Sequence, residues 1–197
     1  MRLDYNSPIV LTYSIICIVI FYIDHFLGTN VTQYFTLNGD FNATSPASWF
    51  SLVSYSFGHA STEHLWGNLS FLLLLGPFIE EKHTSFDLFM MTFFTVILTA
   101  ILHIAFFDAG LMGASGVVFM FIALSSFANA KPGTIPLTFI LIAVLFIGKE
   151  VVASMKTDNV SQFAHIVGGI IGTIFGFWKS KYENRPSTIR IEEVNNN

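Results

Sequence analysis

Six apolar stretches of roughly 20 residues each constrain the fold of this chain more than any other feature. About 20 residues of helix cross the hydrocarbon core of a bilayer. The composition agrees, because 53% of the residues are hydrophobic and only 11% are charged, whereas a soluble domain carries about 25% charged residues. The sequence therefore predicts an all-α membrane protein with a bundle of six transmembrane helices. The predicted spans cover about 8–27, 64–82, 87–107, 114–130, 134–154 and 160–178.

The segments outside the spans predict a single domain over residues 1–181. The first span is expected to be retained, because the apolar run after Arg2 is not followed by the small-residue cleavage site of a signal peptide. The long connection 28–63 is rich in aromatic residues and is expected to lie partly at the membrane interface. Residues 182–197 are polar and are predicted to be a flexible cytoplasmic tail.

The lysines and arginines indicate how the chain is oriented in the membrane. With the amino terminus inside, only Lys149 and Lys156 fall toward the outer face. The other seven are cytoplasmic: Arg2, Lys82, Lys131, Lys179, Lys181, Arg185 and Arg190. This bias predicts that both termini are cytoplasmic.

The unusual polar residues gather at one end of three spans. Because successive spans alternate in direction, the second, fourth and sixth all enter from the outer side. Their entry ends carry His64 and Asn68, then Ser115, then His165, which lies roughly 7 Å into its span. The four side chains are therefore expected at similar depth near the outer face.

These residue types fit the chemistry of a serine hydrolase. His64 and Asn68 are four apart on one helix face, and both can donate hydrogen bonds to an oxyanion. His165 can act as the general base that activates Ser115 as a nucleophile. The pattern predicts a Ser–His dyad.

Small residues surround the predicted nucleophile. Gly113, Ala114 and Gly116 flank the serine and leave room for a substrate backbone. Gly168, Gly172 and Gly176 form a small-residue seam that lets the sixth span approach the fourth. Phe119, one turn after the serine, is either a core residue or a ring that stacks on His165.

These motifs together resemble the rhomboid family of intramembrane serine proteases. The match comprises Gly113-Ala114-Ser115-Gly116, His64-x-x-x-Asn68 and Ala164-His165-Ile166-Val167-Gly168-Gly169, in the family's order. Glu80-Glu81-Lys82 and His59 are also similar to the family, and the likeness extends over nearly the whole chain, to Phe177.

The resemblance implies a six-helix bundle with a short fourth helix that starts midway across the membrane. It implies that Ser115 attacks the scissile carbonyl, that His165 takes its proton, and that His64, Asn68 and the Ser115 main-chain N–H bind the oxyanion. Substrates would be single-pass transmembrane segments cleaved near the outer face, and the localisation would be a bacterial inner or plasma membrane.

Two departures from the family are visible. Trp49-Phe50-Ser51 lacks the arginine that often follows tryptophan early in the first loop. Phe119 stands where bacterial members often have tyrosine. Neither departure affects the predicted dyad.

The remaining titratable residues have ordinary explanations. His83 is expected to be solvated beside Lys82, His103 to make a structural hydrogen bond, and His59 to brace the first loop. Asp108 and Glu63 are expected in loops, so no carboxylate is predicted at the level of the serine.

Two other functions remain open from the residues alone. An inactive rhomboid-like protein could bind membrane helices without cutting them, and an ion or metal transporter could use intramembrane histidines. A transporter would place polar groups at several depths, whereas here they form one layer. No cofactor, no metal site and no nucleic-acid partner is predicted, and the partners expected are transmembrane substrates and the lipid bilayer.

Overall fold

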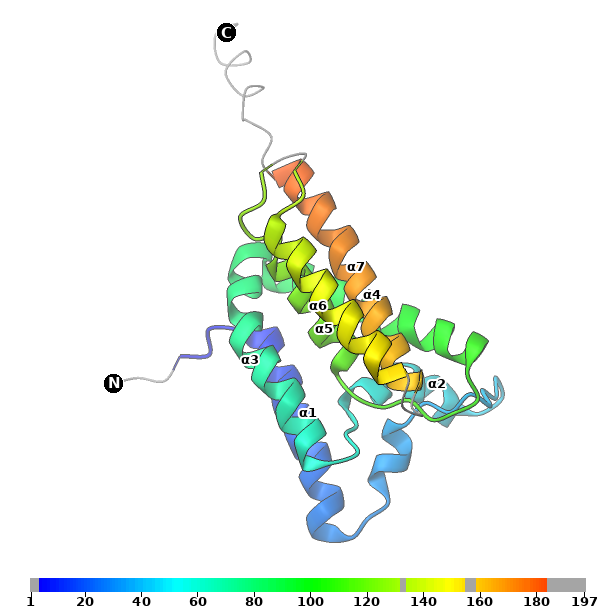
Figure 1. Ribbon diagram of the computed structural model, residues 1–197. Coiled ribbons are helices and arrows are strands. Elements are labelled where there is room, and N and C mark those ends of the chain that lie inside the picture. Colours follow the sequence, from blue (N-terminus) through cyan, green and yellow to red (C-terminus); the bar gives the residue numbers. More distant parts are fainter. Residues whose placement is uncertain (1–3, 132–133, 155–158, 184–197) are drawn as a thin grey trace, which may run out of the picture.

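The computed structural model describes residues 4–131, 134–154 and 159–183, which form a bundle of helices (Figure 1). The α-helices are α1 Pro8–Leu27, α2 Pro46–Ser54, α3 Thr62–His83, α4 Ser85–Phe106, α5 Ser115–Ser125, α6 Leu137–Ser154 and α7 Asn159–Glu183. Two 3₁₀ helices, η1 Val31–Phe35 and η2 Tyr55–Phe57, lie in the long first connection. Within the described ranges there is no β-strand, which confirms the all-α class.

Each of the six predicted spans overlaps a helix. Helix α5 is short, as the resemblance implies for the fourth helix, and it is shorter still than the predicted range 114–130. It ends at Ser125, whereas the prediction ran to residue 130, because the chain leaves the α-helix through tight turns after that serine. At about 1.5 Å per residue its 11 residues cover only about half of a bilayer core. Arg2, Lys156 and, from residue 184, the predicted tail lie outside the described residues.

Two helices of the described chain, α1 and α4, are long and apolar enough to cross a membrane by themselves. The apolar helix α5 is too short to pass the same test. Helix α3 has sufficient length, but it carries polar or charged residues at both ends, including His64, Asn68 and Glu80. The count of six membrane-crossing helices therefore stays a prediction.

Helix α5 is the centre of the bundle. Nine of its 11 residues are buried, which is the burial expected of a helix surrounded by other helices. Figure 1 shows α3, α5 and α7 running in the same direction, as the alternation of spans predicts. Their starts, which carry His64, Ser115 and His165, therefore lie toward one end of the bundle.

Glycines bring α7 into backbone contact with α5. A Cβ atom added at Gly168 would overlap the carbonyl oxygen of Gly116, and one added at Gly172 would overlap that of Met120. Gly176 faces the ring of Phe127 just as closely. The predicted small-residue seam is confirmed, and it sets the distance between these two helices.

The first connection is tied to the segment that leads into α5. Leu37 and Leu111 exchange two backbone hydrogen bonds of 2.9 and 2.8 Å. The carbonyl of Tyr55 accepts from the N–H of Gly113 at 2.9 Å, and its hydroxyl donates to the Val96 carbonyl of α4. The connection thus fixes the backbone two residues before Ser115.

A buried carboxylate joins α1 to α3. Glu80 is 4% exposed, and its two oxygens accept hydrogen bonds from the N–H groups of Ile9 and Val10 at 3.1 and 3.2 Å. These N–H groups belong to the first turn of α1, where no intrahelical acceptor exists and where negative charge is stabilising. Glu80 therefore acts as a cap supplied by another helix.

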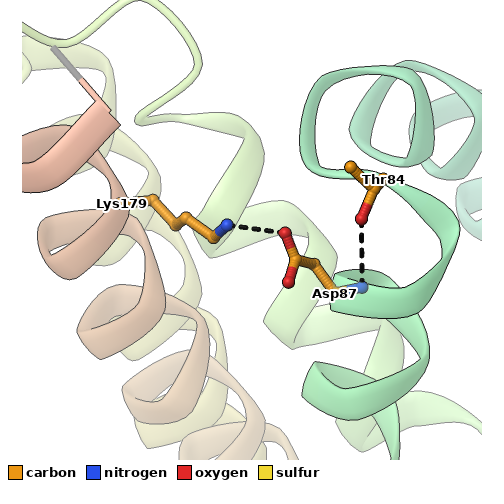
Figure 2. A network of polar contacts seen from close by, with 3 residues as sticks. All are labelled: Thr84, Asp87 and Lys179. Carbon is orange, nitrogen blue, oxygen red and sulfur yellow. Dashed lines mark hydrogen bonds and ion pairs between the residues drawn. The ribbon is translucent and has the colours of Figure 1, made fainter.

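The turn between α3 and α4 consists of the single residue Thr84, which has a φ of 66°. Its hydroxyl accepts from the Asp87 N–H at 3.3 Å, and the Asp87 carboxylate pairs with Lys179 of α7 at 2.7 Å (Figure 2). The prediction that His83 is solvated is wrong, because it is 4% exposed. It lines a hollow between the ends of α3, α5 and α7, which cover it.

Candidate active site

Ser115 is the first residue of α5 and is 6% exposed. The N–H groups in the first turn of a helix have no intrahelical acceptor, so they are available to bind negative charge beside the hydroxyl. Gly113, two residues earlier, has a φ of +123°, a conformation that favours glycine. The backbone thus turns sharply just before the serine.

His165 lies on α7 opposite Phe119 of α5. Their rings stack with centroids 4.1 Å apart and planes 4° from parallel, which confirms the stacking considered for Phe119. Phe119 is one helical turn after Ser115, on the same face of α5. The stacked ring and the contact of Gly168 with Gly116 therefore hold His165 next to the start of α5.

His64 and Asn68 of α3 face the glycine before the nucleophile. A Cβ atom at Gly113 would lie 2.6 Å from Cε1 and 2.8 Å from Nε2 of His64, and 3.7 Å from Nδ2 of Asn68. Any larger residue at position 113 would displace the imidazole. Helices α3 and α7 both pack against α5, so the residues of α3 and α7 named here flank the same helix.

His59 fixes the Asn68 side chain. The amide Nδ2 of Asn68 can only donate, so it donates to Nε2 of His59 at 3.0 Å. The Nδ1 of His59 then carries the hydrogen and donates to the Phe57 carbonyl at 3.2 Å. Both ring nitrogens are thus used by the neutral form, which confirms that His59 braces the first connection.

Burial keeps His59 neutral. Its side chain is 3% exposed, and burial together with the nearby His64, whose ring centroid is 5.0 Å away, lowers the pKa of His59 to about 4. The Asn68 amide has a second N–H that this bond does not use. The hydrogen bond to His59 thus fixes the Asn68 amide near the start of α5, with one N–H left to donate.

The structure brings together Ser115, His165, His64, Asn68, Phe119 and the glycines Gly113, Gly116 and Gly168, while Ala114 is fully buried beside them. Only part of the glycine pattern is sterically required. A Cβ at Gly116 would meet the Ala164 carbonyl oxygen at 3.4 Å, which is an ordinary contact. The close approach depends on Gly168 instead.

The two acidic residues expected in loops, Asp108 and Glu63, are both exposed. Asp108 is exposed in a loop as predicted, whereas Glu63 lies in the first turn of α3 and not in a loop, because the helix begins at Thr62 after its Ser61 cap. His103 makes the expected structural bond, with Nε2 2.7 Å from the Ala109 carbonyl. Over the described ranges no group of three or more His, Cys, Asp or Glu residues could hold a metal ion.

An apolar cavity of about 360 Å³ adjoins the stacked rings, between α5, α6 and α7. Phe119 and His165 line it together with aliphatic residues such as Ile122, Ile142 and Ile166. A cavity of this character suits apolar side chains more than charged ones. The candidate site is therefore a small polar layer beside an apolar chamber.

Tyr55 is the position that the sequence patterns did not reveal. It supports the site through its backbone carbonyl, which holds the Gly113 N–H, and a backbone acceptor leaves no mark in residue type. Its burial, 3% exposed with the hydroxyl bonded to α4, comes from contacts across 41 residues of sequence.

Comparison with known proteins places these features in a family. A family model described as the Rhomboid domain matches residues 46–182, which contain every residue of the candidate site. The protein belongs to the rhomboid family. Its members are membrane-embedded, which agrees with the apolar helices α1 and α4.

Three relatives show how far the similarity extends. Rhomboid-like protein 11, chloroplastic, of Arabidopsis thaliana is 25% identical over 191 residues, covering 89% of this chain and 65% of the relative. Rhomboid protease GlpG of Serratia proteamaculans is 25% identical over 182 residues, covering 89% of this chain and 64% of the relative. Rhomboid-related protein 1 of Caenorhabditis elegans is 32% identical over 137 residues, covering 64% of this chain and 38% of the relative. The chain thus spans less than two thirds of the length of each of these relatives.

Proposed function

We propose that this rhomboid-family protein is an intramembrane serine endopeptidase in which Ser115 and His165 form a catalytic dyad. The observation that carries the proposal is the parallel stacking of His165 on Phe119, one turn from Ser115. A histidine held at that position by a ring and by glycine contacts does not need an aspartate to orient it. A relative named as a protease, GlpG of Serratia proteamaculans, supports the same activity class.

The reaction would proceed in two halves. The Ser115 hydroxyl oxygen attacks the scissile carbonyl carbon while His165 takes the hydroxyl proton. Collapse of the tetrahedral intermediate breaks the C–N bond, and His165 gives its proton to the leaving amine. A water molecule then attacks the ester carbonyl carbon while His165 takes one of its protons. Collapse of this second intermediate breaks the bond between the carbonyl carbon and Ser115 Oγ, His165 returns its proton to that oxygen, and the acid product gives the other water proton to solvent and leaves as a carboxylate.

The negative charge of each tetrahedral intermediate would be bound by His64, by Asn68 and by the main-chain N–H of Ser115. Such donors are worth about 10²- to 10³-fold in rate when they are fixed before the reaction begins. The bond from Asn68 to His59 supplies that fixation for the amide.

The proposed substrates are single-pass transmembrane segments that unwind near the outer face, because an intact helix hides its backbone carbonyls. The apolar cavity beside His165 would receive a substrate side chain. The lysine and arginine bias supports an active site toward the outer face, with both termini cytoplasmic. The proposed location is a bacterial inner or plasma membrane, the setting of bacterial members of the family.

The other candidate is a rhomboid-like protein that binds membrane helices without cleaving them, for which the relative from Arabidopsis thaliana gives a reason, since its name states no protease activity. The two candidates differ in whether the serine hydroxyl reacts. Both chemical partners of a dyad are retained here, which favours the protease.

The deciding experiment compares the wild-type protein with Ser115→Ala in proteoliposomes that contain a single-pass substrate with small residues near its outer end. Wild type should release the ectodomain and react with a fluorophosphonate, and Ser115→Ala should do neither while it keeps its helical circular dichroism. His165→Ala should also lose the label, because an unassisted hydroxyl is a poor nucleophile. Equal cleavage by Ser115→Ala would exclude the proposed nucleophile, and absence of cleavage and label in wild type would favour the binding protein.

A further inference from the structure

A second polar site lies at the opposite ends of the helices that carry the dyad. Helices α3, α5 and α7 end around a hollow of about 260 Å³. Lys82 and His83 of α3, Asn129 after α5, and Lys179 and Ser180 of α7 contribute polar lining. None of these residues belongs to the candidate active site.

The acidic and the basic side chains at the end of α3 face different sides of the helix. The carboxylate of Glu80 turns toward α1, where it accepts the N–H bonds of Ile9 and Val10. Glu81 lines a separate cleft beside α1, with Ser7. The acidic side chains therefore face one side of the helix end, and the basic ones face the hollow.

The two lysines of the hollow differ in their pairing. Lys179 is 11% exposed and pairs with Asp87 at 2.7 Å, as Figure 2 shows. Lys82 is exposed and has no ion pair among the described residues. Within the described residues Asp87 pairs with Lys179 and no carboxylate pairs with Lys82, so the positive charge of Lys82 is available to a ligand.

Aromatic residues place the hollow at the edge of the apolar zone. Trp178 is 53% exposed on α7, and the ammonium of Lys179 lies 5.5 Å from its ring centre. Ile174 and Phe177, which precede Trp178 on α7, are also exposed apolar residues. Exposed tryptophan beside lysine is typical of the level at which lipid headgroups lie.

We propose that this hollow binds the phosphate of an acidic glycerophospholipid. Basic pockets between the ends of membrane helices bind such headgroups, and each lysine near the surface contributes about 1 kcal/mol, which is roughly fivefold in affinity. The phosphate would contact Lys82 and Lys179, and the acyl chains would follow the exposed apolar face of α7. The bound lipid would join the ends of α3 and α7.

The test uses the Ser115→Ala protein in detergent, so that it does not depend on proteolysis. Retention of added phosphatidylglycerol and phosphatidylcholine is measured by native mass spectrometry, together with the thermal midpoint at each lipid concentration. Phosphatidylglycerol should be retained in preference and should raise the midpoint. Equal retention of the two lipids would overturn the proposal.

Three variants locate the site. Lys82→Gln should weaken phosphatidylglycerol retention about fivefold and Lys82→Arg should preserve it. Lys131→Gln removes an exposed lysine that lies next to the hollow but does not line it, and it should leave the retention of phosphatidylglycerol unchanged. Equal losses in Lys82→Gln and Lys131→Gln would show a diffuse charge effect and overturn the assignment.

A last arm separates lipid from soluble phosphate. Glycerol 3-phosphate at millimolar concentration should neither raise the midpoint nor displace phosphatidylglycerol, because it lacks acyl chains for the α7 face. Stabilisation by glycerol 3-phosphate equal to that by the lipid would overturn the lipid and leave a site for a soluble anion. If Lys82→Gln loses helical circular dichroism, Lys82→Arg and wild type are compared in the two lipids instead. Preferential retention of phosphatidylglycerol by both proteins supports the proposal, and its absence overturns the proposal.

Discussion

The two ends of the α5–α7 pair use opposite kinds of polar interaction. At the end with Ser115 and His165, Ser115, Asn68 and His59 are buried, and a hydrogen bond orients Asn68 while ring stacking orients the half-buried His165. At the other end, Lys179 and Asp87 form an ion pair beside an open hollow. In the proposed reaction a displacement of about 1 Å at the first end would greatly slow cleavage, whereas an ion pair at the second end weakens only gradually with distance.

The comparison also shows how one helix pair serves both ends. Gly168 sets the contact with the α5 backbone near the dyad, and Gly176 faces Phe127 near the hollow. A change in the first contact should alter the reaction, and a change at the hollow should alter only stability or lipid binding. The following variants test that division, beginning with the largest expected effect.

Gly168→Val should abolish cleavage and lower the free energy of unfolding by about 3 kcal/mol. The added side chain would overlap the Gly116 carbonyl, and overpacking of this kind costs about 1–3 kcal/mol or somewhat more. Gly169→Val is the matched control for stability, because nothing lies within 4 Å of a Cβ there. Its cleavage is not compared, since Gly169 lines the apolar cavity proposed for a substrate side chain. Thermal unfolding in detergent is measured for both variants and cleavage for Gly168→Val, and an equal loss of stability in the two variants would contradict the close contact of α7 with α5.

Much of this arrangement was predictable because the informative residues differ in kind from their surroundings. Ser115 and His165 stand out as polar residues in apolar spans, and the spacing of Gly168, Gly172 and Gly176 marks one helix face. The order of the spans then predicts which polar residues share a depth.

Other features could not be predicted, for two physical reasons. The bonds of Gly113 to Tyr55 and of Leu37 to Leu111 join backbone atoms, which every residue type supplies. The burial of His83 depends on where α5 and α7 end, and its neighbour Lys82 gave the opposite indication. Local composition does not contain such tertiary contacts.

Asn68→Ala should lower kcat by about 10²- to 10³-fold with little change in KM. The amide donor acts on charge that develops only in the transition state, so its loss does not weaken ground-state binding. Gly67→Ala, on the neighbouring position of α3 where a Cβ meets nothing within 4 Å, is the control. Steady-state cleavage in proteoliposomes measures both constants. A rise in KM at constant kcat would assign Asn68 to substrate binding instead.

His59→Gln should reduce the amount by which the stability of the protein falls as the pH is lowered. Burial lowers the pKa of His59 from its ordinary 6.5 to about 4 in the folded protein, so between these values the unfolded chain binds the proton and the folded chain does not. Its contribution is complete above pH 6.5 and is lost as the pH falls to about 4, by about 3 kcal/mol at most.

Glutamine keeps an acceptor for Asn68 but does not titrate, so the variant isolates the proton. Thermal midpoints measured from pH 7.5 to pH 4 should fall less steeply in His59→Gln than in wild type. Parallel slopes for wild type and His59→Gln would mean that another group governs acid unfolding.

Asp87→Asn should have the smallest effect, a loss of about 0.5–1 kcal/mol in unfolding free energy and unchanged kcat. The Asp87 side chain is 36% exposed, so water weakens its attraction to Lys179, and exposed pairs are worth about 0.2–1 kcal/mol. Because Asp87 lies at the start of α4, its removal also loses the favourable position of a negative charge at a helix N-terminus. Salt should reduce the difference between Asp87→Asn and wild type, since ions screen an exposed pair. A large fall in kcat would contradict the separation of roles between the two ends. It would mean that the ion pair at the far end of α7 positions His165.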